Sequence, residues 1–328
     1  MPVSQRFIDL LNVPLPLLRE AGEKEKIDGA KGMSRWQLAD SLEERPRASL
    51  EGLSQGYLYA GRTSLSWYRF DEPRDPEADV AEDEDSENAP PETLSGLALD
   101  PDAVREILNE MSESGDAFSE ASRPAEITRD PKLVVARERS DGTVLLTFAT
   151  EKPVGRVIKD FEKTPVFADE FFNAVLDVSS GLIEVRTNQQ TAHRFGQSWL
   201  SDFCDRFDGL AAFPVGISIN DARALKGELA AGLHRYRGKA GDGGSIDTVE
   251  FTVSPDFEDL EGEADFETAR AGSEQLIGDL AFTFDESQFT IRVSCLKGSI
   301  YFVTPAPESA LEYVREALRT IKVRHHKA

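Results

Sequence analysis

The stretch from Phe172 to Phe207 changes its hydrophobic period half-way along. Its first part alternates apolar and polar residues around the turn Ser179-Ser180-Gly181, which predicts a β-hairpin. From Thr191 the apolar residues follow a helical period, with Phe195, Trp199 and Phe203 on one face. A hairpin followed by an amphipathic helix is the unit of a sheet with helices packed on one side.

A similar order recurs towards the C-terminus. Alternation predicts strands at residues 245–254, 278–284, 288–295 and 299–303, and Pro307 begins a final amphipathic helix. The pattern therefore predicts the α+β class: a mainly antiparallel, twisted sheet with helices on one face, in two related halves. The other face of the sheet would be open or used for binding.

Residues 1–70 have a different pattern, with short helical runs broken by prolines, and we expect a small helical domain there. Thr63 to Phe70 fits either a short strand or the end of that domain. The segment Asp71 to Glu92 is almost devoid of apolar residues and rich in acid, which is typical of a flexible linker. The predicted organisation is a helical domain at 1–70, an acidic linker at 71–95 and a sheet domain at 96–328.

The chain carries a formal charge of −23, spread along most of its length. This fits the acidic surface of a protein adapted to a salt-rich cytoplasm, and it also fits a basic partner. The first residues are too short an apolar run, and too interrupted by proline and charge, for a signal peptide or a membrane span. We therefore expect a soluble cytoplasmic protein with no membrane partner.

No catalytic, cofactor or metal motif stands out. Cys204 and Cys295 are the only cysteines and have no histidine pair at ligand spacing nearby. His193 fits a surface or capping residue, and the glycines from Gly238 to Gly244 lack the spacing of a phosphate loop. The sequence predicts a protein that is not an enzyme and binds no cofactor.

The densest positive cluster is HRYRGK, which contains Arg235, Tyr236, Arg237 and Lys239. Arginine binds phosphate through its planar fork, and a neighbouring tyrosine can stack on a base. These four residues are therefore candidates for binding nucleic acid or a partner. The alternative is that the arginines neutralise neighbouring acidic groups within the fold.

The segment from Trp36 to Phe70 combines an apolar helix, a Glu-Glu-Arg break, an Ala-Ser step, a second helix ending in tyrosine and a Trp-x-x-Phe close. This pattern resembles the pyrin-like domain of the centromere protein N (Chl4) family of kinetochore proteins. The resemblance implies a helical domain coupled to a curved antiparallel sheet, a basic groove for DNA and a fold-related protein partner. It points locally to Arg45, Arg47, Arg62 and Arg69, each equally explicable as a surface ion-pair partner.

These observations favour a non-enzymatic binding or scaffold protein that engages DNA, a DNA-bound protein or a fold-related partner through the space between its two domains. The alternative is a protein–protein adaptor or regulatory subunit with no nucleic-acid role. An enzyme whose site matches no motif is the third hypothesis.

Overall fold

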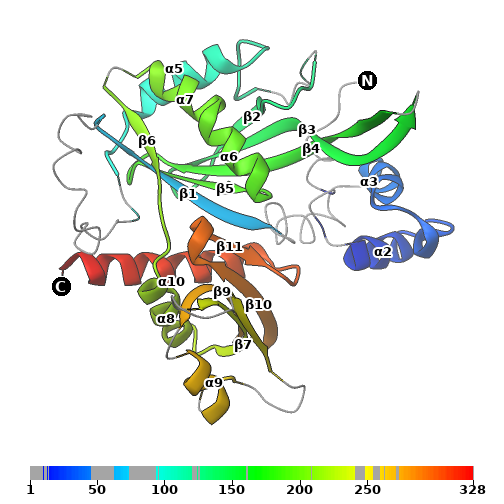
Figure 1. The fold of residues 1–328 in the computed structure, drawn as a ribbon. Helices are drawn as coiled ribbons and strands as arrows, with labels where there is room; N and C mark the ends of the chain where they lie inside the picture. Colours follow the sequence, from blue (N-terminus) through cyan, green and yellow to red (C-terminus); the bar gives the residue numbers. More distant parts are fainter. Residues whose placement is uncertain are drawn as a thin grey trace. The chain divides into compact units, whose positions relative to one another are not determined.

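The computed structural model describes residues 10, 13, 15–45, 63–73, 94, 96–119, 124, 126–159, 162–207, 209–240, 248–253, 259–261, 263–270 and 273–327. These residues form two compact units, which are treated separately below (Figure 1). Unit 1 contains the described residues from 66 to 214. Unit 2 contains those from 10 to 65 and from 215 to 327.

Unit 1 is built on strands that pair in the order β2-β3-β4-β5-β1, with β6 against β1. The strands are β1 (Ser64–Asp71, whose first two residues belong to unit 2), β2 (Lys132–Glu138), β3 (Thr143–Lys159), β4 (Glu162–Asp177), β5 (Leu182–Arg186) and β6 (Ala211–Pro214). The helices are α5 (Pro101–Met111), α6 (Gln189–Gln197) and α7 (Trp199–Asp205). The pairs β2–β3, β3–β4 and β4–β5 are antiparallel, so the predicted α+β class is confirmed.

The core of unit 1 is an aromatic cluster between the strands and helices α6 and α7. Phe148 of β3 lies 5.2 Å from Phe172, 5.1 Å from Phe195 and 4.8 Å from Trp199, measured between ring centroids. Trp199 stacks in turn on Phe203 at 5.4 Å. The predicted helical face is therefore the face that packs on the sheet, because its aromatic residues recur once per turn.

The predicted hairpin is confirmed as β4 and β5, joined at residues 178–181. The helix after it divides at Ser198, which ends α6 and begins α7. The sequence pattern also predicts separate strands at Thr143 to Thr150 and at Val154 to Phe161, and this is wrong because β3 runs on without a break to Lys159. The register of β3 against β4 shifts at Pro153, and such an irregularity accommodates a residue that cannot donate to the ladder.

Replacing Gly181 by alanine is expected to destabilise the protein by more than about 1 kcal/mol. Gly181 has φ +58°, and a Cβ atom there would lie 2.0 Å from the carbonyl oxygen of Leu97, which belongs to the backbone and cannot rotate away. Gly142→Ala is the matched control, because Gly142 has φ +81° with nothing within 4 Å of an added Cβ. Chemical denaturation of both variants measures the difference, and equal losses would contradict the close approach at Gly181.

The sheet of unit 2 has the strand order β11-β10-β9-β7-β8. Its strands are β7 (Gly232–Ala240), β8 (Thr248–Thr252), β9 (Ser273–Phe284), β10 (Ser287–Ser294) and β11 (Ser299–Phe302). Its helical elements are α2 (Leu15–Lys24), η1 (Ala30–Gly32), α3 (Arg35–Glu43), α8 (Ile219–Glu228), α9 (Ala264–Arg270), η5 (Cys295–Lys297) and α10 (Glu308–Lys327). The strands predicted at β8, β9, β10 and β11 and the final helix are confirmed.

One face of this sheet packs on α10. Phe284 of β9 stacks on Tyr313 of α10 at 5.0 Å between ring centroids, and Phe282 lies 6.2 Å from the same ring. A buried ion pair joins α10 to α8, with Lys322 Nζ 2.8 Å from Asp221 Oδ2. Strand β7 was not expected from the sequence, because its polar residues and two glycines obscure the alternation.

Both units contain a helix, four strands that are neighbours in the sheet, and a second helical segment, in this order along the chain. In unit 1 the series is α5, β2 to β5, then α6 and α7. In unit 2 it is α8, β7, β9, β10, β11 and α10, with β8 and α9 inserted after β7.

The expectation of an open second sheet face is wrong for unit 1. The residues that alternate with those of the aromatic core are also buried there, namely Leu145, Asn173, Val175 and Glu184.

The compact units divide the chain differently from the predicted domains. The predicted sheet domain contributes to both units, and the segment Thr63 to Phe70 supplies most of β1, which is the strand alternative left open for it. Ser34, which the sequence favours as a helix N-cap, caps α3, since its Oγ accepts a hydrogen bond from the Gln37 N–H. The second predicted helix, after Arg45, and nearly all of the acidic linker lie outside the described residues.

Candidate nucleic-acid interface

Strand β7 sorts the predicted positive cluster onto two faces. Side chains alternate along a strand, so Arg235, Arg237 and Lys239 share one face, about 7 Å apart in succession. Tyr236 points the other way and is 1 % exposed, with its ring edge-on to Phe266 of α9 at 5.3 Å. The expectation that Tyr236 stacks on a base is therefore wrong, because the ring is part of the core of unit 2.

The cationic face continues across the sheet in register. Arg235 is opposite Asp279 of β9, Asp279 is opposite Arg292 of β10, and Arg292 is opposite Tyr301 of β11. On the other side Arg235 is opposite Thr252 of the edge strand β8. Residues opposite each other in paired strands project to the same side, so these five form one row across the sheet. The row lies on the face away from the Phe282 and Phe284 rings that contact α10.

Two carboxylates hold two of these arginines in fixed positions. Arg292 binds Asp279 through both Nε and Nη2, with distances of 2.7 Å and 2.9 Å to the two carboxylate oxygens. Arg235 donates from Nε and Nη2 to Oε1 of Glu250, at 3.1 Å and 2.8 Å. The Asp279 hydrogen bond, partly opposed by burial, raises the pKa of Arg292 above its ordinary value. Such forked pairs give a guanidinium a defined plane.

The two remaining cations of the face are more available. Arg237 and Lys239 are exposed, and no ion pair or side-chain hydrogen bond joins either of them to another described residue. Two carboxylates, Glu250 and Asp279, are found among the described side chains of this face. The cations among them are four: Arg235, Arg237, Lys239 and Arg292. These described side chains carry two more positive than negative charges, in a chain whose formal charge is −23.

The other predicted residues are not brought into this row. Arg69 belongs to unit 1, where its Nη2 lies 3.8 Å from Oδ2 of Asp71. Arg45 is exposed directly after α3. Arg47 and Arg62 lie outside the described residues.

Arg292 and Tyr301 were missed by reasoning from the sequence. The available indication was the alternation in β10, where Phe289, Ile291 and Val293 are buried while the residues between them are polar. That pattern predicts a polar sheet face. The strand order that places β10 and β11 in line with β7 could not be read from it.

A second positive run at the C-terminus does not form a free patch. Lys322 is buried against Asp221, and Arg324 Nη1 pairs with Glu228 Oε2 at 2.9 Å. The side chains of residues 325–327 are outside what the structure describes.

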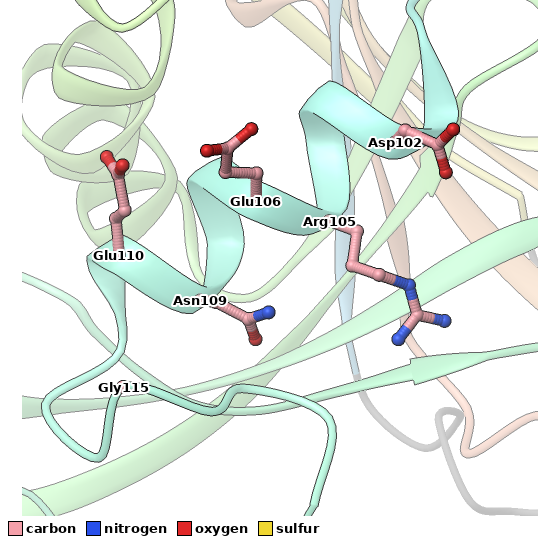
Figure 2. Close-up of a pocket in the computed structure, with 6 residues that line it drawn as sticks. All are labelled: Asp102, Arg105, Glu106, Asn109, Glu110 and Gly115. Carbon is pink, nitrogen blue, oxygen red and sulfur yellow. The ribbon is translucent and has the colours of Figure 1, made fainter.

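A shallow depression of about 560 Å³ lies along α5 (Figure 2). Asp102, Glu106 and Glu110 line it at one-turn intervals, together with Arg105. Arg105 pairs with Glu138 and lies over the ring of Phe118 at 4.5 Å. The depression is acidic and open, so it is unsuited to phosphate.

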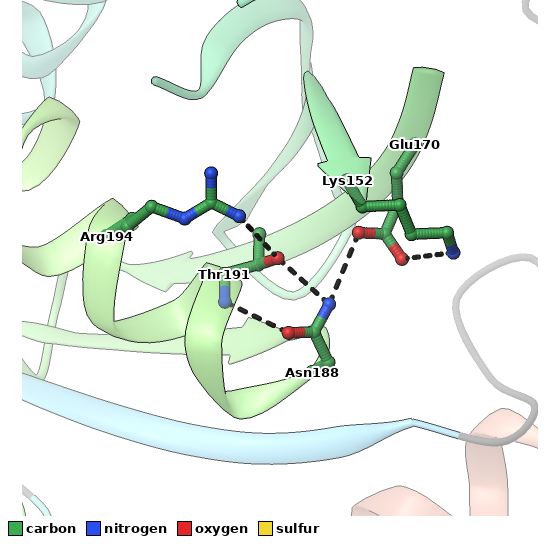
Figure 3. Close-up of polar contacts among 5 residues, drawn as sticks. All are labelled: Lys152, Glu170, Asn188, Thr191 and Arg194. Atoms are coloured by element: carbon green, nitrogen blue, oxygen red, sulfur yellow. Dashed lines mark hydrogen bonds and ion pairs between the residues drawn. The ribbon is translucent and has the colours of Figure 1, made fainter. Parts of the chain in front are cut away.

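A polar cluster near the start of α6 is held together by hydrogen bonds and an ion pair within unit 1 (Figure 3). Asn188 caps the helix by accepting from the Thr191 N–H at 3.0 Å and donates to Glu170 at 3.2 Å. Glu170 also binds Lys152 at 2.8 Å. Arg194 donates to the backbone oxygen of Arg129 at 3.0 Å. The carboxylate of Glu170 is thus already bound by Lys152 and Asn188, and the Thr191 N–H at this helix end is already capped by Asn188.

No protein-family model and no curated protein sequence matches this chain. Within the described ranges, no group of three or more histidine, cysteine, aspartate or glutamate side chains is placed to hold a metal ion. No helix in the described part of the chain is long and apolar enough to cross a membrane.

Proposed function

We propose that the chain is a non-enzymatic binding protein that recognises DNA through the polar face of the unit 2 sheet. Arg237 and Lys239 would contact phosphates, and the forked Arg235 and Arg292 would add positive potential beside them. The proposed interface keeps the cations of the positive cluster found in the sequence. It omits the buried Tyr236 and adds Arg292 from the neighbouring strand β10.

The observation that supports the proposal most is the concentration of cations on one strand face of an otherwise acidic protein. Fixed arginines flanked by available cations suit a ligand with regularly spaced negative charges. The overall negative charge opposes approach at low salt. At about 1 M salt the Debye length is near 3 Å, so long-range repulsion is screened while direct contacts persist.

The double variant Arg237→Gln with Lys239→Gln is expected to weaken DNA binding by about tenfold or more, because two phosphate contacts are removed. Fluorescence anisotropy with labelled duplex DNA measures the affinity across a range of salt concentrations. The control is Lys24→Gln with Lys31→Gln, which removes the same charge from two exposed side chains of unit 2, 74 % and 83 % exposed.

We expect the control to bind like the wild type. Equal weakening in both double variants would mean that net charge alone matters, and it would overturn the assignment to β7. Absence of binding to any DNA by the wild-type protein at every salt concentration would reject the DNA proposal as a whole.

The second candidate function is that of an adaptor that binds a basic or fold-related protein and has no nucleic-acid role. The acidic depression along α5 favours it, because Asp102, Glu106 and Glu110 suit lysine or arginine side chains. Affinity purification with and without nuclease separates the two candidates. Partners that persist after nuclease treatment, and are lost on Glu106→Gln with Glu110→Gln, would favour the adaptor.

A further inference from the structure

Tyr301 differs from the other tyrosines that the structure describes. Tyr68 donates its hydroxyl to the backbone oxygen of Ala192 at 2.9 Å, and Tyr236 and Tyr313 pack against phenylalanine rings. Tyr301 is half-buried on β11, and no ring contact or hydrogen bond joins its side chain to another described residue. An aromatic side chain on a polar sheet face that makes no hydrogen bond or ring contact with the described residues can take up a ligand.

The neighbour of Tyr301 across the sheet is the fixed guanidinium of Arg292. The two residues are opposite each other in the β10–β11 register, and the double hydrogen bond to Asp279 holds the arginine fork in place. Aromatic rings and arginine planes are the two kinds of surface on which unpaired bases stack. The pair therefore offers a stacking platform, with carboxylate oxygens beside it that can accept from base amino groups.

The available cations lie on the same face at a distance suited to a continuing strand of nucleic acid. From β11 to β7 there are three strand intervals, which corresponds to about 14 Å. Arg237 and Lys239 project from β7 on the side of Arg235, which belongs to the same row as Tyr301. A polyanionic backbone crossing the strands would reach these cations with one base on the tyrosine.

We infer that this face binds a single-stranded nucleic acid, with a base stacked on Tyr301 beside Arg292 and phosphates at Arg237 and Lys239. The inference rests on the proposed function and specifies its ligand. Bases in a duplex are stacked on each other and present only their edges in the grooves, so a flat sheet face with one free ring recognises them only after the strands have separated.

The test compares oligothymidine, oligouridine and a DNA duplex in anisotropy titrations of wild type, Tyr301→Phe and Tyr301→Ser. Wild type and Tyr301→Phe should bind a single strand alike, because both keep the ring. Tyr301→Ser should bind it about tenfold or more weakly, with duplex affinity unchanged. The oligothymidine and oligouridine arms distinguish DNA from RNA as the source of the strand. Thermal denaturation checks that both variants are folded.

Equal affinity of all three proteins for single strands, with duplex binding retained, would overturn the inference and leave the proposed function standing. If Tyr301→Ser does not fold, Tyr301→Leu serves as the ring-free variant, because leucine retains an apolar side chain at that position. Binding of neither single strands nor duplex by the wild type would reject both the inference and the proposed function.

Discussion

Lys322→Met is expected to lower the free energy of unfolding by about 3–5 kcal/mol, because it leaves an aspartate charge buried without its partner. Lys322 and Asp221 are 5 % and 2 % exposed, and 2.8 Å separates Nζ from Oδ2. Asp221 also accepts from the N–H of Ser218 at 2.8 Å as part of the capping box of α8. The pair therefore links α10 to the start of α8 at a position from which water is largely excluded.

Arg324→Met is the matched control on the same two helices. Arg324 pairs with Glu228, but its side chain is 63 % exposed, so we expect a loss below about 1 kcal/mol. Adding Asp221→Asn to Lys322→Met should restore part of the stability, since the unpaired charge is removed. Urea denaturation measures all four proteins. Equal losses for Lys322→Met and Arg324→Met would show that burial of the first pair has no energetic consequence.

The cost of Lys322→Met should also depend on pH. Burial alone would raise the pKa of Asp221, but the hydrogen bond and charge of Lys322, with Ser218, hold the pKa below its ordinary value. A lowered pKa stabilises the folded protein above the unfolded value of about 3.9, and the effect disappears as the pH falls through the folded value. The difference between wild type and variant should therefore be largest near neutral pH and shrink in acid.

Phe148→Ala is expected to cost about 3–5 kcal/mol through the cavity it leaves in unit 1. The ring is fully buried and contacts aromatic rings from the sheet and from both α6 and α7. Phe207→Ala is the control at the edge of the cluster. Phe207 is half-buried and, among the described residues, its ring contacts one other ring, that of Phe203, in a tilted arrangement, so its loss should be clearly smaller. Denaturation midpoints that shift equally would contradict the central position of Phe148.

The hydrophobic pattern predicted most strands and helices of both units because local alternation and helical spacing reflect which side of an element is buried. It failed at β7, where Gly232, Gly238 and the cations hide the period, and at β3, where Pro153 suggests a break. Strand β7 is fixed by pairing with β9, which is distant in the sequence, and β3 continues past Pro153 because it pairs with β4 along its length. A local pattern contains no information about that pairing.

The candidate site was only partly predictable for the same reason. The cluster around Arg235 was visible in the sequence as a run of positive residues. Tyr236 is buried and Arg237 is exposed because successive side chains of a strand point to opposite faces of the sheet. Arg292 and Tyr301 join the site through the order of strands in the sheet. Proximity of that kind comes from tertiary pairing, which composition and charge do not encode.

The dependence of DNA affinity on salt tests the phosphate contacts most directly. Each contact contributes about 0.9 to the slope of log Kd against log salt for duplex DNA, through release of a counterion. If Arg237 and Lys239 contact phosphates, the slope should fall by about 2 in the double glutamine variant relative to wild type. Parallel lines for the two proteins would contradict the proposed interface, even if the variant bound more weakly at every salt concentration.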